Sequence, residues 1–400
     1  MRRGGALVLG GVVLGAAIVF ASRPLGVVGL GLLAAGVLSR AWSALASVPA
    51  DVRMSITPDP ATEGDEVALQ LSGRRRVRVP GATTVVSGTF DRLGAFECRL
   101  RGKGRSLRGD VALGVLPRGR FTCSGGVIEV RDPLGLDVRS RPLAGVPGVM
   151  VRPRLVELDS LFSDAGRRLD DGRRLLLRRT AGFDLHSVRE YEQGESLRRV
   201  HWPTSAKRGQ LMVKELEDAP RESVVVLLDC DPAGQAGEPP HSSFDAAVRA
   251  AGSLVRAHVV RGRRAALTTT RGDTPLVRAS SLEGDFQAVL ATLAAADADA
   301  RQELGRFLAN PHTAVTGAGE LIVVTAVLQQ AAVRRILDVG GRRLVSVVWV
   351  DAPSFVGRPT RGDTGLLRLS SAGIPVAVVR SGDDLRSALQ LPRRRAGIGG

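Results

Sequence analysis

The chain has 400 residues, more than one ordinary domain holds, so several structural units are expected. Hydrophobic residues make up 44% of it and charged residues 24%, a balance that excludes a disordered polymer and a bundle buried entirely in a membrane. The three cysteines, at 98, 123 and 230, lie far apart, which excludes a disulfide framework and a CxxC metal knuckle and indicates a reducing compartment. Aromatic residues make up only 4%, so a stacking platform for single-stranded nucleic acid is poorly supplied.

The formal net charge is +16, from 56 Lys+Arg against 40 Asp+Glu, and only Lys103, Lys207 and Lys214 are lysine. Such an excess attracts nucleic acid or an anionic lipid surface, although net charge describes encounter and solubility rather than a site. Coding bias in a GC-rich genome is the alternative explanation, because Arg, Ala, Gly and Val are all frequent. Basic-patch nucleic-acid binding stays an alternative function, and it would weaken steeply with salt.

Residues 1–50 are predicted to form a transmembrane helical hairpin. Residues 4–22 are uncharged and mostly apolar, nearly the length that crosses about 30 Å of hydrocarbon as a helix. A second apolar run covers 25–49, interrupted only by Arg40, which can extend its charge to the interface, with Trp42 suited to the same boundary. A cleaved secretory signal peptide is the alternative, but it would not require the second apolar run.

The arginines around these runs predict the orientation. Arg2, Arg3, Arg40 and Arg53 flank the two runs on the outside, whereas only Arg23 lies in the turn between them. The positive-inside rule therefore places everything after residue 50 in the cytoplasm. The predicted localisation is the plasma membrane, with two passes and cytoplasmic soluble domains.

Residues 51–155 are predicted to form a β-rich, sandwich-like domain. The region consists of short apolar runs broken by Gly, Pro and Asp, without a helix-length apolar period. Strands are expected at 65–72, 83–87, 95–100, 106–116 and 120–130. No chemistry is visible in this region.

Residues 156–222 form an arginine-rich connector. Between 167 and 214 there are twelve Arg or Lys against six Asp or Glu, interspersed around Tyr191 and Trp202. A disordered tail rarely contains tryptophan, so an ordered, salt-bridged segment is expected. It could bind an acidic partner, a phosphate or nucleic acid, or it could be an internally neutralised brace between domains.

Within this connector the chain resembles the domain-of-unknown-function-58 family. The family pattern runs R-x-Y-x-x-G-D-x-x-R-x-I-x-W-x-x-S-A-R, followed by L-x-V. The matching residues are Arg189, Tyr191, Gly194, Glu195, Arg198, His201, Trp202, Ser205, Ala206, Lys207 and Leu211. Glu195, Val200 and Lys207 replace the usual Asp, Ile and Arg, which are mild departures.

The resemblance implies the architecture of the whole chain: a transmembrane hairpin, a β-rich segment, the signature and a von Willebrand factor A-like domain. Family members are commonly encoded beside MoxR-type AAA+ ATPases, and no catalytic activity is established for them. The resemblance thus implies a partner, a MoxR-type ATPase, rather than a reaction, and makes the signature residues the candidate partner-binding site.

Residues 223–392 are predicted to form an α/β domain, followed by a basic, glycine-rich tail at 393–400. Apolar strands are expected at 223–228, 264–270, 320–326, 344–351 and 374–379, with helices at 243–260, 283–300, 328–339 and 383–389. Continuous apolar strands separated by helices predict a mostly parallel, doubly wound sheet. Ligands of such sheets bind outside the carboxyl ends of the strands, which indicates Asp229, Cys230 and Asp231.

Asp229 and Asp231 are candidate ligands of a divalent ion such as Mg²⁺. Von Willebrand A domains carry Asp-x-Ser-x-Ser at this position, because Mg²⁺ requires hard oxygen donors. Here Asp231 replaces the first serine, and Ala233, without a donor, replaces the second. The motif is degenerate. The alternative is that the two carboxylates cap the following turn.

Other catalytic motifs are absent from the sequence: it contains no GxxxxGK[ST], HExxH or GxSxG pattern. Asp184, His186, Ser187 and Ser205 lie near one another in sequence, but a triad requires a geometry that sequence does not show. The leading hypothesis is a non-enzymatic, membrane-anchored cytoplasmic scaffold for protein interaction. A metal-dependent hydrolase that uses Asp229 and Asp231 is the alternative.

Overall fold

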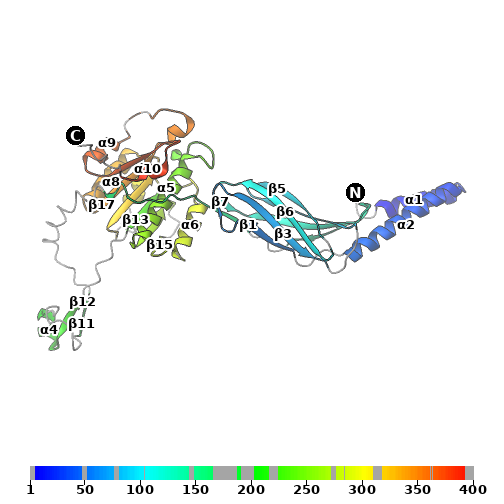
Figure 1. Cartoon of the computed structure of the whole chain (residues 1–400), viewed down its shortest axis with the longest axis horizontal. Coiled ribbons are helices and arrows are strands. Elements are labelled where there is room, and N and C mark those ends of the chain that lie inside the picture. The colour runs from blue at the N-terminus through cyan, green and yellow to red at the C-terminus, as the bar shows by residue number, and fades with distance from the viewer. Residues whose placement is uncertain are drawn as a thin grey trace, which may run out of the picture. The chain divides into compact units, whose positions relative to one another are not determined.

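A computed structural model describes residues 5–46, 52–75, 81–102, 104–143, 148–164, 187–190, 202–215, 224–271, 276–282, 284–309, 318–360, 362 and 364–391 (Figure 1). The chain divides into two compact units, Met1–Arg152 and Pro153–Gly400. The division falls at Pro153, whereas the sequence prediction ended the β-rich domain at residue 155.

Two apolar helices begin the first unit, α1 (Gly5–Val19) and α2 (Arg23–Ala46). They pack closely at glycines: a Cβ added at Gly10 would lie 2.9 Å from the Leu33 nitrogen, and one at Gly29 would lie 2.8 Å from the Leu14 nitrogen. Such small-residue contacts are typical of helices that pack in membranes. Among the described helices, α2 alone is long and apolar enough to span a bilayer, from Arg23 to Leu45, whereas α1 has 15 residues.

Short strands build the rest of this unit, in agreement with a β-rich region. Their order is β1-β3-β6, β2-β10-β7 and β5-β4-β8-β9, and every neighbouring pair is antiparallel except β2 with β10. The strands are β1 (Val52–Thr57), β2 (Ala61–Thr62), β3 (Glu66–Arg74), β4 (Thr83–Phe90), β5 (Gly94–Leu100), β6 (Ser106–Val115), β7 (Gly119–Phe121), β8 (Cys123–Arg131), β9 (Val138–Pro142) and β10 (Val149–Arg152). The five runs expected from the sequence correspond to six of these strands, β3 to β8, because the run at 120–130 divides into β7 and β8.

Alternation along these strands gives the unit one apolar interior. In β3 the buried side chains are Val67, Leu69 and Leu71, and the residues between them are more exposed. They join Phe90 and Phe96, whose ring centroids lie 5.4 Å apart, in a single core cluster. The sheets therefore bury one face and leave the other to solvent, as antiparallel sheets commonly do.

The second unit contains a six-stranded sheet with the order β15-β14-β13-β16-β17-β18. All neighbours are parallel except the edge pair β14 and β15. Counted within this sheet the order is 3-2-1-4-5-6, so the direction of winding reverses between β13 and β16. The strands are β13 (Val224–Leu228), β14 (Ala265–Thr269), β15 (Val277–Ala279), β16 (Glu320–Thr325), β17 (Leu344–Val350) and β18 (Val376–Val379).

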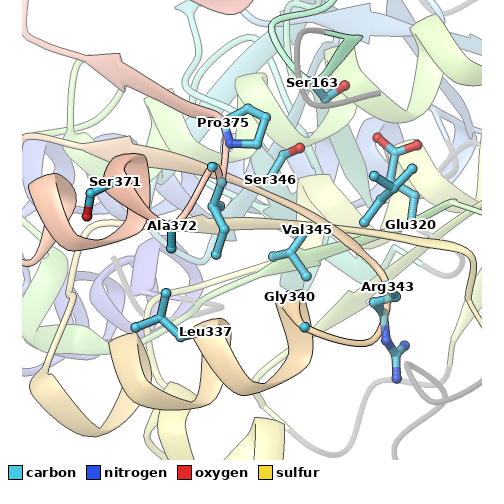
Figure 2. Close-up of a pocket in the computed structure, with 14 residues that line it drawn as sticks. Ser163, Glu320, Leu337, Gly340, Arg343, Val345, Ser346, Ser371, Ala372 and Pro375 are labelled. Atoms are coloured by element: carbon cyan, nitrogen blue, oxygen red, sulfur yellow. The ribbon is translucent and has the colours of Figure 1, made fainter. Parts of the chain in front are cut away.

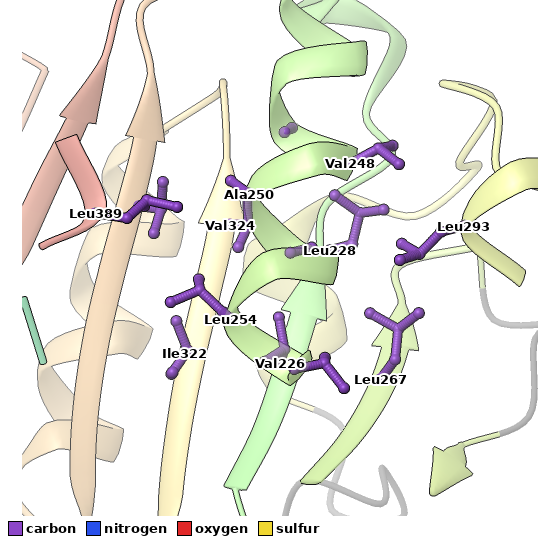
Figure 3. Packing of buried hydrophobic residues seen from close by; sticks show 14 of the residues in the cluster. Val226, Leu228, Val248, Ala250, Leu254, Leu267, Leu293, Ile322, Val324 and Leu389 are labelled. Carbon is purple, nitrogen blue, oxygen red and sulfur yellow. The ribbon is translucent and has the colours of Figure 1, made fainter. Parts of the chain in front are cut away.

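Helices cover both faces of this sheet (Figure 3). Val224, Val226 and Leu228 of β13 pack with one set of helices, whereas Val225 and Leu227 pack with the other. The first set is α5 (Ser243–Val260), α6 (Asp285–Ala295) and α10 (Leu385–Leu389); the second is α7 (Leu304–Ala309), α8 (Gln330–Gly340) and α9 (Leu366–Ser371). The predicted doubly wound arrangement is thus observed, and α5 has the predicted bounds. The short antiparallel strand β15 was not predicted.

Residues 153–164 belong to the α/β unit, and 156–164 of them begin the predicted connector. Leu161 is fully buried in its core, and the Phe162 N–H donates to the Leu389 carbonyl over 3.0 Å. The Val156 N–H donates to the Ser253 hydroxyl of α5 over 3.0 Å. This part of the connector therefore belongs to the folded body of the second unit.

Candidate functional site

The carboxyl edge of the parallel sheet gathers polar side chains, as the sequence predicts. Asp229 directly follows β13, Thr270 follows β14, Thr325 ends β16 and Asp351 follows β17. All four are buried, with exposed fractions of 5% or less. Asp229 and Thr325 flank the point where the strand order reverses, which is where doubly wound sheets bind ligands.

Hydroxyl groups hold the Asp229 carboxylate. Thr325 Oγ1 donates to Oδ2 over 2.7 Å, and Thr270 Oγ1 donates to Oδ1 over 3.0 Å. The Cys230 N–H in turn donates to Thr270 Oγ1 over 2.8 Å, which fixes that hydroxyl. Burial raises the pKa of Asp229 to about 6, and the hydrogen bonds from the two threonines offset part of this effect. Burial thus favours the protonated form of Asp229.

Asp231 has a different environment, although it lies only two residues away. Its Oδ1 accepts the Ala233 N–H over 2.9 Å and caps the short 3₁₀ helix η2 (Pro232–Gly234). The capping interpretation that the sequence left open is therefore confirmed for Asp231. The same bond uses one of the oxygens that an ion would require.

These residues do not fit a Mg²⁺ ion. Mg²⁺ requires a near-octahedral set of hard oxygen donors, and here Ala233 contributes none. Hydrogen bonds join Asp229 to the end of β16 at the switch point. Its carboxylate accepts the Thr325 hydroxyl, and its own N–H donates to the Val324 carbonyl over 2.8 Å. Among the residues that the structure describes, no group of three or more His, Cys, Asp or Glu is arranged to hold a metal.

The signature segment forms a small element of its own where it is described. Strand β11 (Ser187–Glu190), which contains Arg189, pairs antiparallel with β12 (Met212–Glu215), and helix α4 (Trp202–Arg208) precedes β12. Ser205 is buried and its hydroxyl accepts the Met212 N–H over 2.8 Å, so it joins α4 to β12. The predicted site residues outside the described ranges are Tyr191, Gly194, Glu195, Arg198 and His201.

Helix α4 presents an exposed aromatic residue with positive charge nearby. The Trp202 side chain is 63% exposed and Leu211, which precedes β12, is 41% exposed. Ala206, Lys207 and Arg208 are exposed on the same short helix. Within the signature, Ser205 thus has a structural role. Trp202 and Lys207 form an exposed surface that is both apolar and basic.

A pocket that the sequence did not indicate lies at the opposite, amino-terminal edge of the sheet, with a volume of about 630 Å³ (Figure 2). Its lining includes Ser163, Glu320, Arg343 and Ser346. Glu320 is buried and pairs with Arg263, with 3.1 Å between Nη1 and Oε2, so its charge is compensated. The buried Ser163 hydroxyl has no hydrogen-bond partner among the described residues. The lining residues are spread between positions 163 and 375, so no local motif could have revealed them.

The fold and the site define a multidomain protein with N-terminal apolar helices, a β-rich unit and a doubly wound α/β unit. The family model described as "Protein of unknown function DUF58" matches residues 187–395. The chain therefore belongs to this family. The match includes both the signature segment and the α/β sheet, and it confirms the family that the signature residues indicated.

Among curated proteins, the chain is similar to "Uncharacterized protein YeaD" of Bacillus subtilis (strain 168), with 25% identity over 166 residues. That alignment covers 40% of this chain and 39% of the relative, so well under half of the relative's length is matched.

Two solved structures among those that the chain matches have low TM-scores. The uncharacterized protein lmo2446 from Listeria monocytogenes EGD-e has a TM-score of 0.19 at 13% identity and covers 27% of this chain and 10% of that one. Cwp6 from Clostridium difficile also has a TM-score of 0.19, at 8% identity, and covers 84% of this chain and 46% of that one. TM-scores of this size do not define a shared fold.

Proposed function

We propose that this protein is a membrane-anchored interaction protein that binds another protein through its signature segment and performs no catalysis. In this proposal α1 and α2 form a two-pass hairpin in the plasma membrane, and both folded units lie in the cytoplasm. The support is the length and apolar composition of α2, its close packing with α1 at Gly10 and Gly29, and the arginines that flank the helices.

The observation that carries the proposal is the exposed Trp202. A tryptophan with 63% of its surface open to solvent contributes little to the stability of its own unit. Tryptophan and arginine are enriched where protein interfaces gain most of their binding energy, and Arg208 is exposed on the same helix. Ser205 holds α4 against β12, so this surface is presented by an ordered element.

The α/β unit is proposed to be von Willebrand factor A-like. Its support is the strand order 3-2-1-4-5-6 with one antiparallel edge strand, and helices on both faces. Because both carboxylate oxygens of Asp229 and one of Asp231 accept hydrogen bonds within the chain, partner binding by this unit is proposed to be independent of a metal. The same bonds disfavour the metal-dependent hydrolase.

The proposed partner is a MoxR-type AAA+ ATPase, which the family resemblance implies. Binding of such an ATPase to the full chain in detergent would be compared for the wild type, Trp202→Ala and Leu367→Ala. Leu367 is 85% exposed on α9, so its truncation controls for the general loss of an exposed apolar side chain. Trp202→Ala is expected to weaken binding at least tenfold, and Leu367→Ala is expected to leave it unchanged.

Two outcomes would contradict the proposal. Equal affinities for wild type and Trp202→Ala would remove the signature surface from the interface. Recovery of the wild-type chain in the soluble fraction after cell lysis, without detergent, would remove the membrane anchor.

A further inference from the structure

The end of the β-rich unit that adjoins α2 collects positive charge. Two contacts define this end: Trp42 of α2 packs against Val130 together with Ala82, and the Ser43 hydroxyl donates to Asp137 Oδ2. Both contacts lie where β8 ends and β9 begins. Helix α2 is therefore joined to one particular end of the strands.

Hydrogen bonds place further strand ends here, from the β1-β3-β6 sheet and from the β5-β4-β8-β9 sheet. Arg75 donates to the Ala82 carbonyl over 2.9 Å, and its own N–H donates to the Arg105 carbonyl over 2.8 Å. Arg101 and Arg108 exchange backbone hydrogen bonds of 2.7 Å. Arg99 donates to Thr83 over 2.9 Å. The strand ends near 75, 82, 101 and 105 thus lie together with the end of α2.

The exposed charged side chains at this end are arginines. We call this group the basic collar; its members are Arg53, Arg74, Arg99, Arg101, Arg105, Arg108, Arg131 and Arg139. Two of the eight arginines pair with nearby carboxylates, Arg131 with Glu129 at 2.8 Å and Arg139 with the buried Asp137 at 4.0 Å. The other six are in none of the ion pairs among the described residues. The net charge that this end shows to solvent is therefore strongly positive.

The opposite end of the same strands has a different composition. Glu66 and Arg74 are the two ends of β3, roughly 25 Å apart at the usual rise per residue. Around Glu66 the exposed charges are mixed, with Asp59 and Asp91 beside Arg92 and Arg120. The positive charge is thus concentrated at the end that α2 reaches, not spread over the unit.

We infer that the basic collar binds the anionic phospholipid headgroups of the membrane in which the helices are anchored. This inference rests on the proposed function, because α2 must leave the bilayer beside the collar. Arginines within a Debye length of an anionic leaflet are attracted to it. Leu134, 67% exposed in the turn that bonds to Ser43 through Asp137, is positioned to enter the interface beside Trp42.

Hydrogen exchange of the full chain in lipid nanodiscs tests the inference. Discs that contain about 30% phosphatidylglycerol in phosphatidylcholine would be compared with discs of phosphatidylcholine alone. Peptides that cover 99–108 and 131–139 are expected to exchange more slowly in the anionic discs, whereas those that cover 88–94 and 116–124 are unchanged. The difference should disappear at about 0.5 M salt, where the Debye length falls to about 4 Å.

Charge variants assign the effect to the collar. The double variant Arg101→Glu, Arg105→Glu is expected to lose the lipid-dependent protection, and Arg101→Gln, Arg105→Gln to lose part of it. The matched control is Arg92→Glu, Arg120→Glu, which makes the same charge change at the opposite end and should retain full protection. Because all four side chains are exposed, all variants should keep the wild-type thermal transition.

The failures are distinguishable. A chain that does not co-elute with either disc would overturn the membrane anchor of the proposed function. A chain that co-elutes with both discs but exchanges identically in them would overturn the collar alone. Equal protection of the same peptides by soluble DNA in phosphatidylcholine discs would also overturn it, in favour of a nucleic-acid surface.

Discussion

The two folded units bury their strands in opposite ways. Strand β3 alternates buried and exposed side chains, and the β-rich unit has a solvated face on which charge can collect. Strand β13 is buried at every position, because helices cover both faces of its sheet. The two polar sites described in the α/β unit accordingly lie at strand ends, at Asp229 and at the Glu320 pocket. In the β-rich unit the basic collar lies on open surface.

The largest expected effect comes from a charge placed in each type of strand. Val226→Asp puts a carboxylate into the core of the α/β unit, at a position with no exposure, and is expected to unfold that unit. Val127→Asp makes the same change on the solvated face of β8, where Val127 is 39% exposed, and should cost less than about 1 kcal/mol. Limited proteolysis and circular dichroism would check both. A folded Val226→Asp variant would contradict burial on both faces.

Truncation of a core leucine in each unit tests whether the two units unfold independently. Leu254→Ala in α5 and Leu71→Ala in β3 each remove a side chain with at most 1% exposure, and each should cost about 2–5 kcal/mol. Because the two leucines lie in different core clusters, each variant should lower only the thermal transition of its own unit. Calorimetry that shows one shared transition, lowered equally by both, would show that the units unfold together.

Two buried carboxyl groups should respond to pH with opposite signs. Burial raises the pKa of Asp229 to about 6 from 3.8, so its contribution to stability is greatest at low pH and declines between about pH 4 and 6. The total decline is about 3 kcal/mol, since each pKa unit corresponds to about 1.4 kcal/mol. Asp229→Asn, which cannot ionise, should flatten this dependence and stabilise the α/β unit at pH 8.

Asp132 provides the contrast within the β-rich unit. Burial tends to raise its pKa, but hydrogen bonds from Asp137, Ser39, Leu134 and Leu136 outweigh burial and lower it. Its contribution is therefore present above pH 4 and lost under more acidic conditions, and Asp132→Asn should destabilise its unit at neutral pH. Thermal unfolding at several pH values measures both variants. Parallel pH profiles for wild type and Asp229→Asn would contradict the assignment of Asp229.

The smallest expected effect concerns the N-terminal caps of two helices in the α/β unit. Ser242 caps α5 through a reciprocal pair of bonds with Asp245, so Ser242→Ala should cost about 1 kcal/mol. Gln329 precedes α8 and forms no capping bond with its side chain, so Gln329→Ala should cost almost nothing. Chemical denaturation would measure the difference. Equal losses would show that local capping does not explain the stability of α5.

Local signals predicted many of the elements because those elements are locally consistent. Helix α5 has an N-cap serine, an acidic residue in its first turn and a regular apolar face, and both of its ends were predicted. The strands β1, β9 and β15 were not predicted. These strands depend on pairing with strands elsewhere in the chain, as Ala279 of β15 pairs with Ala265 of β14.

The sequence also identified Asp229 as a residue at the carboxyl edge, because a polar residue after an apolar parallel strand must lie there. It did not predict that Thr270 and Thr325 would hold this carboxylate, since these residues lie 41 and 96 positions away in the chain. Nor did it predict the pocket that includes Ser163 and Ser346, which are brought together only by the sheet.

The amino-acid order alone thus determined which segments are apolar helices, alternating strands or fully buried strands, and it determined the family through a contiguous signature. These properties depend on neighbours within a few residues. Tertiary structure alone decided where charges accumulate, which carboxylates are already bonded and which tryptophan is exposed. Those properties depend on distances between residues far apart in the chain, and such distances are set by packing rather than by local pattern.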